Sequence, residues 1–153
     1  MSKAIVWFRQ DLRLADNPAL AAALQGHDQI LPVFIHEPAD SGWSPGAASK
    51  WWLHHALVDL SAALEGRLLI RSGQALKTLR GLVAASGAEA VYWNRCYEPA
   101  AIERDTQVKQ ALRADGVRVD SHNAGLMFEP WTVANRQGLP FRVFTPFWKH
   151  LLS

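Results

Sequence analysis

The 153-residue chain is poor in sulfur and has no long apolar run. Cys96 is its only cysteine, which excludes an internal disulfide, and six scattered histidines with one cysteine show no zinc-type spacing. No apolar stretch approaches the roughly 18 residues of a membrane span, and no secretory cleavage site follows the apolar run that begins at Ala4. These absences predict a soluble cytoplasmic protein with no metal site and no membrane partner.

Charge of neither sign is gathered into a block. Sixteen Lys and Arg residues are spread among fourteen Asp and Glu residues, and the net charge is +2 with histidine neutral. A domain whose main partner is nucleic acid usually concentrates its basic residues. DNA is therefore not predicted to be the main partner of this part of the chain.

Sequence signatures of catalysis and of phosphate binding are also missing. No Gly-x-Gly-x-x-Gly follows the first apolar run, and no Gly-Lys-Ser/Thr loop occurs anywhere. His54 and His55 are neighbours on a predicted helix, so they point about 100° apart and cannot chelate one metal together. Cys96 has no basic run beside it, and no Ser-His-Asp set lies at a strand-to-helix elbow. The sequence therefore predicts no catalytic residue.

Five short apolar runs, rich in Val, Ile and aromatic residues, predict buried strands. Four segments with helical periodicity lie between them, each long enough to return the chain parallel to the preceding strand. Right-handed crossovers then give a doubly wound, five-stranded parallel sheet with helices on both faces, a three-layer Rossmann-like α/β fold. The strands are predicted at residues 4–8, 30–35, 68–70, 90–93 and 117–119.

Residues 1–125 are predicted to form this α/β domain. Its first helix should begin with Asn17 as N-cap and Pro18 in the first turn. The second should begin between residues 44 and 49 and carry a stripe of leucines, and the third and fourth should end at Gly87 and Gly116. Residues 126–153, termed the exit segment, are predicted to be irregular up to a helix that is capped by Thr145 and cut short at the last residue.

Several polar and aromatic residues follow the predicted strands, where doubly wound sheets bind ligands. Arg9 could hold an anion or join an ion-pair network, whereas Asp11 and Arg13 are expected to pin their loop. Because adjacent helical positions diverge, one of Trp51 and Trp52 is expected to join the core while the other faces a flat ligand; the alternative is that both belong to the core.

These residues, taken together, resemble the amino-terminal domain of DNA photolyases and cryptochromes. The matches run in the right order over nearly the whole chain. They are residues 7–13 (WFRQDLR) with 16–20 (DNPAL), 92–94 (YWN) with 97–99 (YEP) and Arg104-Asp105, and 143–149 (VFTPFWK).

The resemblance implies a larger protein. A helical domain that would follow this chain holds FAD and acts on damaged DNA, splitting pyrimidine dimers with light. The domain in hand would carry an antenna, a chromophore that passes excitation energy to the flavin, and the protein is expected to be a monomer. A cryptochrome photoreceptor is the alternative within the family, and a free-standing nucleotide-binding protein of similar fold is a third.

The antenna is expected to be methenyltetrahydrofolate, with 8-hydroxydeazaflavin as the alternative. Many folate-binding members carry an Asn-Glu pair where this chain has Ala100-Ala101, so the folate would be held differently here. Residues 51–55 (WWLHH) and 128–131 (FEPW) are similar instead to plant cryptochromes and their nearest bacterial photolyases. From the strand order, the antenna should lie across the ends of the first, second and fourth strands, lined by Arg9, His36, Glu37, Ser49, Trp52, Glu98 and Ala101.

Overall fold

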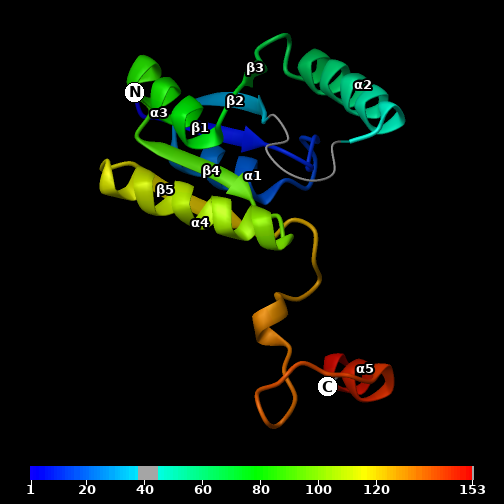
Figure 1. Cartoon of the computed structure of the whole chain (residues 1–153). Coiled ribbons are helices and arrows are strands. Elements are labelled where there is room, and N and C mark those ends of the chain that lie inside the picture. Colours follow the sequence, from blue (N-terminus) through cyan, green and yellow to red (C-terminus); the bar gives the residue numbers. More distant parts are fainter. Residues whose placement is uncertain (38–44, 153) are drawn as a thin grey trace.

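Within residues 1–37 and 45–152, which the computed structural model describes, five parallel strands form one sheet (Figure 1). They are β1 (Lys3–Phe8), β2 (Gln29–His36), β3 (Leu69–Ser72), β4 (Ala90–Asn94) and β5 (Arg118–His122). Their spatial order is β3-β2-β1-β4-β5. This is the doubly wound order in which the chain moves outward from β1 and then returns to its other side at β4. The predicted fold is confirmed.

Four of the five predicted strands run farther at their carboxyl ends in the structure, whereas β1 ends at Phe8 as predicted. β3 and β5 continue past their apolar runs, as far as Ser72 and His122. Their polar ends stay in the sheet because the neighbouring strands supply backbone partners, with Ser72 opposite His36 and His122 opposite Asn94. The apolar pattern of the sequence predicts the buried part of a strand. The full length of the strand also depends on pairing with its neighbours in the sheet.

Helices cover both faces of the sheet, two on each. α1 (Pro18–Gly26) and α2 (Ala47–Ala63) lie over a cluster that contains Phe8, Leu60 and Tyr92. α3 (Ala75–Ser86) and α4 (Pro99–Ala114) lie over the opposite cluster, in which the rings of Trp7 and Trp93 meet edge to face at 5.6 Å. Burying all these side chains, at roughly 25 cal/mol per Å² of apolar surface, is the main stabilising contribution.

The helix boundaries largely follow the sequence signals. Asn17 caps α1, its Oδ1 accepting from the backbone N–H of Leu20 at 3.1 Å. α2 begins at Ala47, inside the predicted interval, and its leucine stripe packs against the sheet. α3 ends at Gly87, whose positive φ of 69° suits a residue without a side chain.

The exit segment is tied to the domain near its start and continues away from the sheet (Figure 1). It contains one short 3-10 turn, Pro130–Thr132, and α5 (Phe144–Leu151). The predicted cap at Thr145 is wrong, because Val143 occupies that position and Thr145 lies inside the first turn. Pro146 is tolerated there since first-turn amides have no intrahelical acceptor. Across the described ranges, no helix combines the length and apolar character that a membrane crossing requires.

Replacing Asn17 tests the polar network at the start of α1. Asn17 is buried, and besides capping the helix it accepts from Asn94 at 2.8 Å and donates to the Arg13 carbonyl at 3.0 Å. Asn17→Ala should therefore lower the free energy of unfolding by about 2 kcal/mol. Sequence alone makes Asn17→Asp nearly neutral, but it would lose the donor to Arg13 and bring a second carboxylate near Asp11, so a cost of about 1 kcal/mol is expected.

Denaturant melts measure both values. Asn135→Ala is the matched control, because the Asn135 side chain makes only local hydrogen bonds in an exposed loop, and it should cost about 0.5 kcal/mol. If Asn17→Ala and Asn135→Ala lowered the free energy of unfolding equally, the proposed contribution of the Asn17 network would be contradicted.

Candidate functional site

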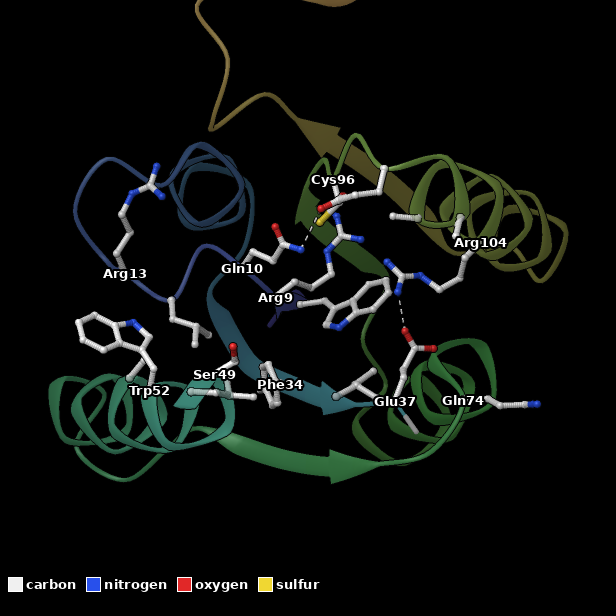
Figure 2. Close-up of a pocket in the computed structure, with 18 residues that line it drawn as sticks. Arg9, Gln10, Arg13, Phe34, Glu37, Ser49, Trp52, Gln74, Cys96 and Arg104 are labelled. Atoms are coloured by element: carbon white, nitrogen blue, oxygen red, sulfur yellow. Dashed lines mark hydrogen bonds and ion pairs between the residues drawn. The ribbon is translucent and has the colours of Figure 1, made fainter. Parts of the chain in front are cut away.

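A cleft of about 970 Å³ opens at the carboxyl ends of β1, β2 and β4 (Figure 2). It lies where α1 and α4 leave their strands toward opposite faces of the sheet, the usual ligand position in this fold. Figure 2 shows Ser49 and Trp52 of α2 on one side of the cleft and Glu37 with Arg104 on the other. Six of the seven predicted site residues line it: Arg9, Glu37, Ser49, Trp52, Glu98 and Ala101.

His36 is the predicted site residue that does not line the cleft. It is the last residue of β2 and is exposed. Successive side chains along an extended chain point to opposite sides, so His36 and Glu37 diverge. Glu37 is the one that reaches the cleft.

The two adjacent tryptophans of α2 are both exposed, Trp51 by 61% and Trp52 by 71%. The prediction that one of them joins the core is wrong. The leucine stripe of α2 already fills the side that faces the sheet, and both indoles lie off that stripe. Trp51 packs on His55, with ring centroids 4.3 Å apart, whereas Trp52 faces the cleft.

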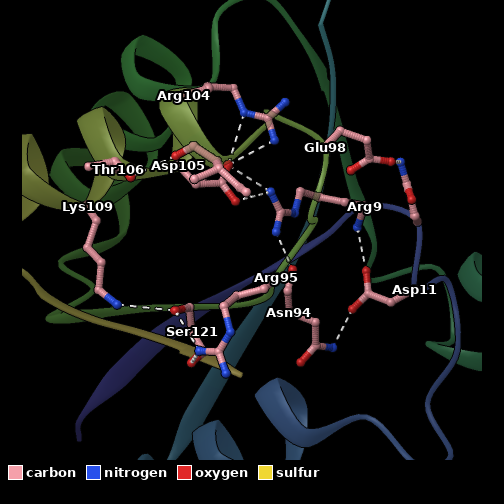
Figure 3. Close-up of polar contacts among 12 residues, drawn as sticks. Arg9, Asp11, Asn94, Arg95, Glu98, Arg104, Asp105, Thr106, Lys109 and Ser121 are labelled. Carbon is pink, nitrogen blue, oxygen red and sulfur yellow. Dashed lines mark hydrogen bonds and ion pairs between the residues drawn. The ribbon is translucent and has the colours of Figure 1, made fainter. Parts of the chain in front are cut away.

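An ion-pair network forms one wall of the cleft (Figure 3). The Arg9 guanidinium donates twice to Asp105, at 2.6 and 2.8 Å, and also to the Asn94 carbonyl. Arg104 donates to the same Asp105 carboxylate at 2.9 Å and to Glu37 at 2.6 Å. The Arg9 side chain is only 8% exposed. Of the two roles that the sequence left open for Arg9, the structure therefore supports the ion-pair network rather than the binding of an anion.

Trp7 forms the floor beneath this network. Its indole is 1% exposed, and the guanidinium carbons of Arg9 and Arg104 lie 4.7 and 5.3 Å from its ring centroid. Such contacts hold the planar groups in fixed positions and add to the ion pairs. The wall is therefore rigid and internally paired.

The loop after β1 is pinned, as predicted for Asp11 and Arg13. Asp11 accepts from the Arg9 amide at 2.8 Å and from the Asn94 side chain at 2.5 Å. Arg13 donates to the carbonyls of Asp16 and Ala124. Sequence reasoning did not single out Asn94, although a polar residue directly after a buried apolar run was the available signal.

Glu98 stands at the N-cap position of α4 without capping it through its side chain. Its carboxylate accepts from the Gln10 side chain at 3.2 Å. Hydrogen bonding to its own backbone amide and to Gln10 holds the pKa of Glu98 below its ordinary value, so this exposed carboxylate is charged at neutral pH.

Cys96 also lines the cleft, and burial raises the pKa of its thiol. The thiol is therefore protonated at neutral pH. Over the described part of the chain, no group of three or more His, Cys, Asp or Glu side chains could hold a metal ion. The described residues of the site offer a roomy shape and hydrogen-bonding side chains.

Photolyases and cryptochromes are among the known proteins that are similar to this chain. A deoxyribodipyrimidine photo-lyase of Agrobacterium fabrum is 47% identical over 150 residues, which cover 96% of this chain and 31% of that protein. Cryptochrome-1 of Arabidopsis thaliana is 41% identical over 155 residues, covering 98% of this chain and 23% of that protein. The crystal structure of a bacterial class III photolyase from Agrobacterium tumefaciens superimposes with a TM-score of 0.92 at 44% identity, covering 99% and 32% of the two chains.

The chain thus spans about a third of the length of these photolyases and aligns with their amino-terminal domain. The family model described as DNA photolyase matches residues 4–153. The matching motifs, the strand order and this near-complete coverage agree, and the chain belongs to the DNA photolyase family as its amino-terminal domain.

Proposed function

We propose that the cleft binds the light-harvesting chromophore of a DNA photolyase. The observation that carries this proposal is the exposed indole of Trp52 facing a roomy cleft at the point where the strand order reverses. A large aromatic side chain left in solvent on a helix that packs its leucines inward is typical of a ligand contact.

The lining fits a flat heteroaromatic ring. The cleft volume of about 970 Å³ falls at the upper end of the range for cofactor sites. Ala100 and Ala101 line it from the first turn of α4 and leave room because their side chains are single methyl groups. A chromophore bound there would supply absorption of light and transfer of its excitation energy to the flavin.

The polar groups of the cleft would orient such a ring. Glu98 and Gln10 are exposed beside the cleft, so their side chains can hydrogen-bond the amide edge of a pterin or a deazaflavin. Glu37 is less suited to this task, since its two carboxylate oxygens already accept from the Ala75 amide and from Arg104. The ring itself would stack on Trp52.

The photolyase family binds FAD and a light-harvesting cofactor, and for this chain we favour methenyltetrahydrofolate over 8-hydroxydeazaflavin as that cofactor. The similarity of residues 51–55 and 128–131 to plant cryptochromes and their nearest bacterial photolyases supports a folate. Ala100-Ala101, in place of an Asn-Glu pair, supports a binding mode that relies on ring contacts.

For the longer protein we propose light-driven repair of pyrimidine dimers in DNA, as a cytoplasmic monomer, with FAD held by a carboxyl-terminal helical domain. The exit segment supports a partner domain, because large apolar side chains such as Met127, Phe144 and Trp148 are exposed along it. The 41% identity to a plant cryptochrome favours a photoreceptor as the second candidate. The helical domain would contain the residues that distinguish the two.

Substitutions at Trp52 and Ala101 test the chromophore site. Trp52→Ala should weaken binding of methenyltetrahydrofolate about tenfold, because the stacked indole contributes roughly 0.5–1.5 kcal/mol beyond the area that it buries. Ala101→Trp should abolish binding by filling the cleft. Absorbance of the bound folate in the near ultraviolet measures occupancy.

Trp51→Ala is the matched control for this experiment. It removes the neighbouring indole, which is similarly exposed but packs on His55 outside the cleft, and it should leave occupancy intact. If Trp52→Ala and Ala101→Trp bind folate as the unmodified chain does, the chromophore site lies elsewhere.

The chain by itself should bind no FAD stoichiometrically and should repair no dimers under blue light. The physical reason is that the domain proposed to hold FAD and to act on the dimer would lie in the longer protein. Absorbance of the purified chain and a dimer-clearance assay measure the two properties. If stoichiometric FAD copurified with the chain, or if dimers were lost in light, the proposal that FAD binding and repair belong to another domain would be contradicted.

A further inference from the structure

We propose that Glu37 is a specificity residue that keeps phosphate-bearing ligands out of the cleft and so selects a chromophore without a phosphate group. The inference rests on the proposed function, since it concerns which ring compounds the same cleft accepts. It follows from the hydrogen bonds of Glu37 and from the pairing of every cationic side chain that lines the cleft.

Doubly wound sheets commonly bind nucleotides at this edge. Phosphate groups are held there by free backbone N–H groups at a helix N-terminus and by free guanidinium or ammonium groups. A site that binds a nucleotide must therefore leave such donors available. In this chain two such donors, the Ala75 amide and the Arg104 guanidinium, already bind Glu37.

Glu37 takes the place that a phosphate would occupy at the start of α3. Its Oε1 accepts from the backbone N–H of Ala75, the first residue of that helix, at 2.9 Å. Its Oε2 accepts from the Arg104 guanidinium at 2.6 Å. A helix amide and a guanidinium are the pair of donors that would hold a phosphate, and the carboxylate saturates both.

The other cationic side chains of the cleft, Arg9 and Arg13, also have partners within the chain, although the buried Nε of Arg9 has none. Arg9 and Arg104 share the carboxylate of Asp105, and Arg13 donates to two backbone carbonyls. Freeing Arg104 for a phosphate would remove the guanidinium donor of Glu37, and freeing Arg9 would remove that of the buried Asn94 carbonyl, which costs more than an exposed ion pair gains.

Glu98 adds a second negative charge at the other helix that begins in the cleft. It stands at the N-cap of α4, and its lowered pKa keeps it ionised at neutral pH. A phosphate approaching either helix N-terminus therefore meets a carboxylate, an arrangement that discriminates by repulsion. An uncharged ring meets no such penalty.

Riboflavin and FMN provide the test, because they differ only by the phosphate. Ring fluorescence should show riboflavin binding at least about tenfold more tightly than FMN to the unmodified chain. Glu37→Gln keeps a carbonyl oxygen for the Ala75 amide but removes the charge, so the ratio of the two dissociation constants should fall to near one. A ratio near one in the unmodified chain, or a ratio that Glu37→Gln leaves unchanged, would overturn the proposal.

Glu65→Gln is the matched control. Glu65 also pairs with an arginine, Arg67, at 2.6 Å, but it lies in the turn before β3, at the opposite edge of the sheet. The control changes the net charge by the same amount and should leave the riboflavin-to-FMN ratio as it is in the unmodified chain. A fall in this ratio equal to that of Glu37→Gln would mean that overall charge, and not the position of Glu37, decides.

Calorimetry with pyrophosphate alone separates this inference from the proposed function. Glu37→Gln should bind pyrophosphate at least about tenfold more tightly than the unmodified chain does, whether or not any ring binds. If riboflavin and folate both fail to bind but this gain is seen, the chromophore proposal fails and the role of Glu37 stands. If folate binds and the gain is absent, the role of Glu37 fails and the chromophore proposal stands.

Discussion

The side chain of Asn94 joins the end of β4 to the segment from Asp11 to Ala19, which lies 75 to 83 residues earlier in the chain. It is buried at the end of β4, where its Oδ1 accepts from the Ala19 amide of α1 at 3.1 Å and its Nδ2 donates to Asn17. The same Nδ2 also donates to Asp11 (Figure 3). A buried amide that loses its partners costs about 1–3 kcal/mol, so this network is satisfied in one arrangement. That arrangement sets the loop after β1 and, through the Asn94 carbonyl, the position of Arg9.

The rigid wall of the cleft follows from this constraint. With Arg9 held by Asn94 and Asp105, Arg104 can bridge Asp105 and Glu37, and the two guanidinium groups lie against Trp7. The charged side chains of this wall pair with one another, which leaves few of them to bind a ligand. A wall of this kind suits a ligand held by shape and ring contacts, which is the role proposed for Trp52 and the alanines of α4.

The loop between β4 and α4 also holds the exit segment. Arg95 donates to Glu129 at 2.5 Å, and the Tyr97 hydroxyl donates to the other carboxylate oxygen at 3.0 Å. The Arg95 guanidinium lies 5.8 Å from the ring centroid of Trp131, which extends the contact along the segment. The same loop that frames the cleft thus sets the direction in which the chain leaves the domain, so the proposed chromophore site and the rest of a longer protein would share one support.

The sequence by itself determined where the strands lie, where α1 and α2 begin, and the family, because apolar periodicity, caps and short motifs depend on residues close together in the chain. It also identified the cleft edge, since parallel strands bring their carboxyl ends together. Only the tertiary structure decided that Arg9 pairs internally, that Glu37 rather than His36 reaches the cleft, and that Trp51 and Trp52 both stay outside the core. Those outcomes depend on contacts such as Arg9 with Asp105, 96 residues apart, whose partners no local pattern specifies.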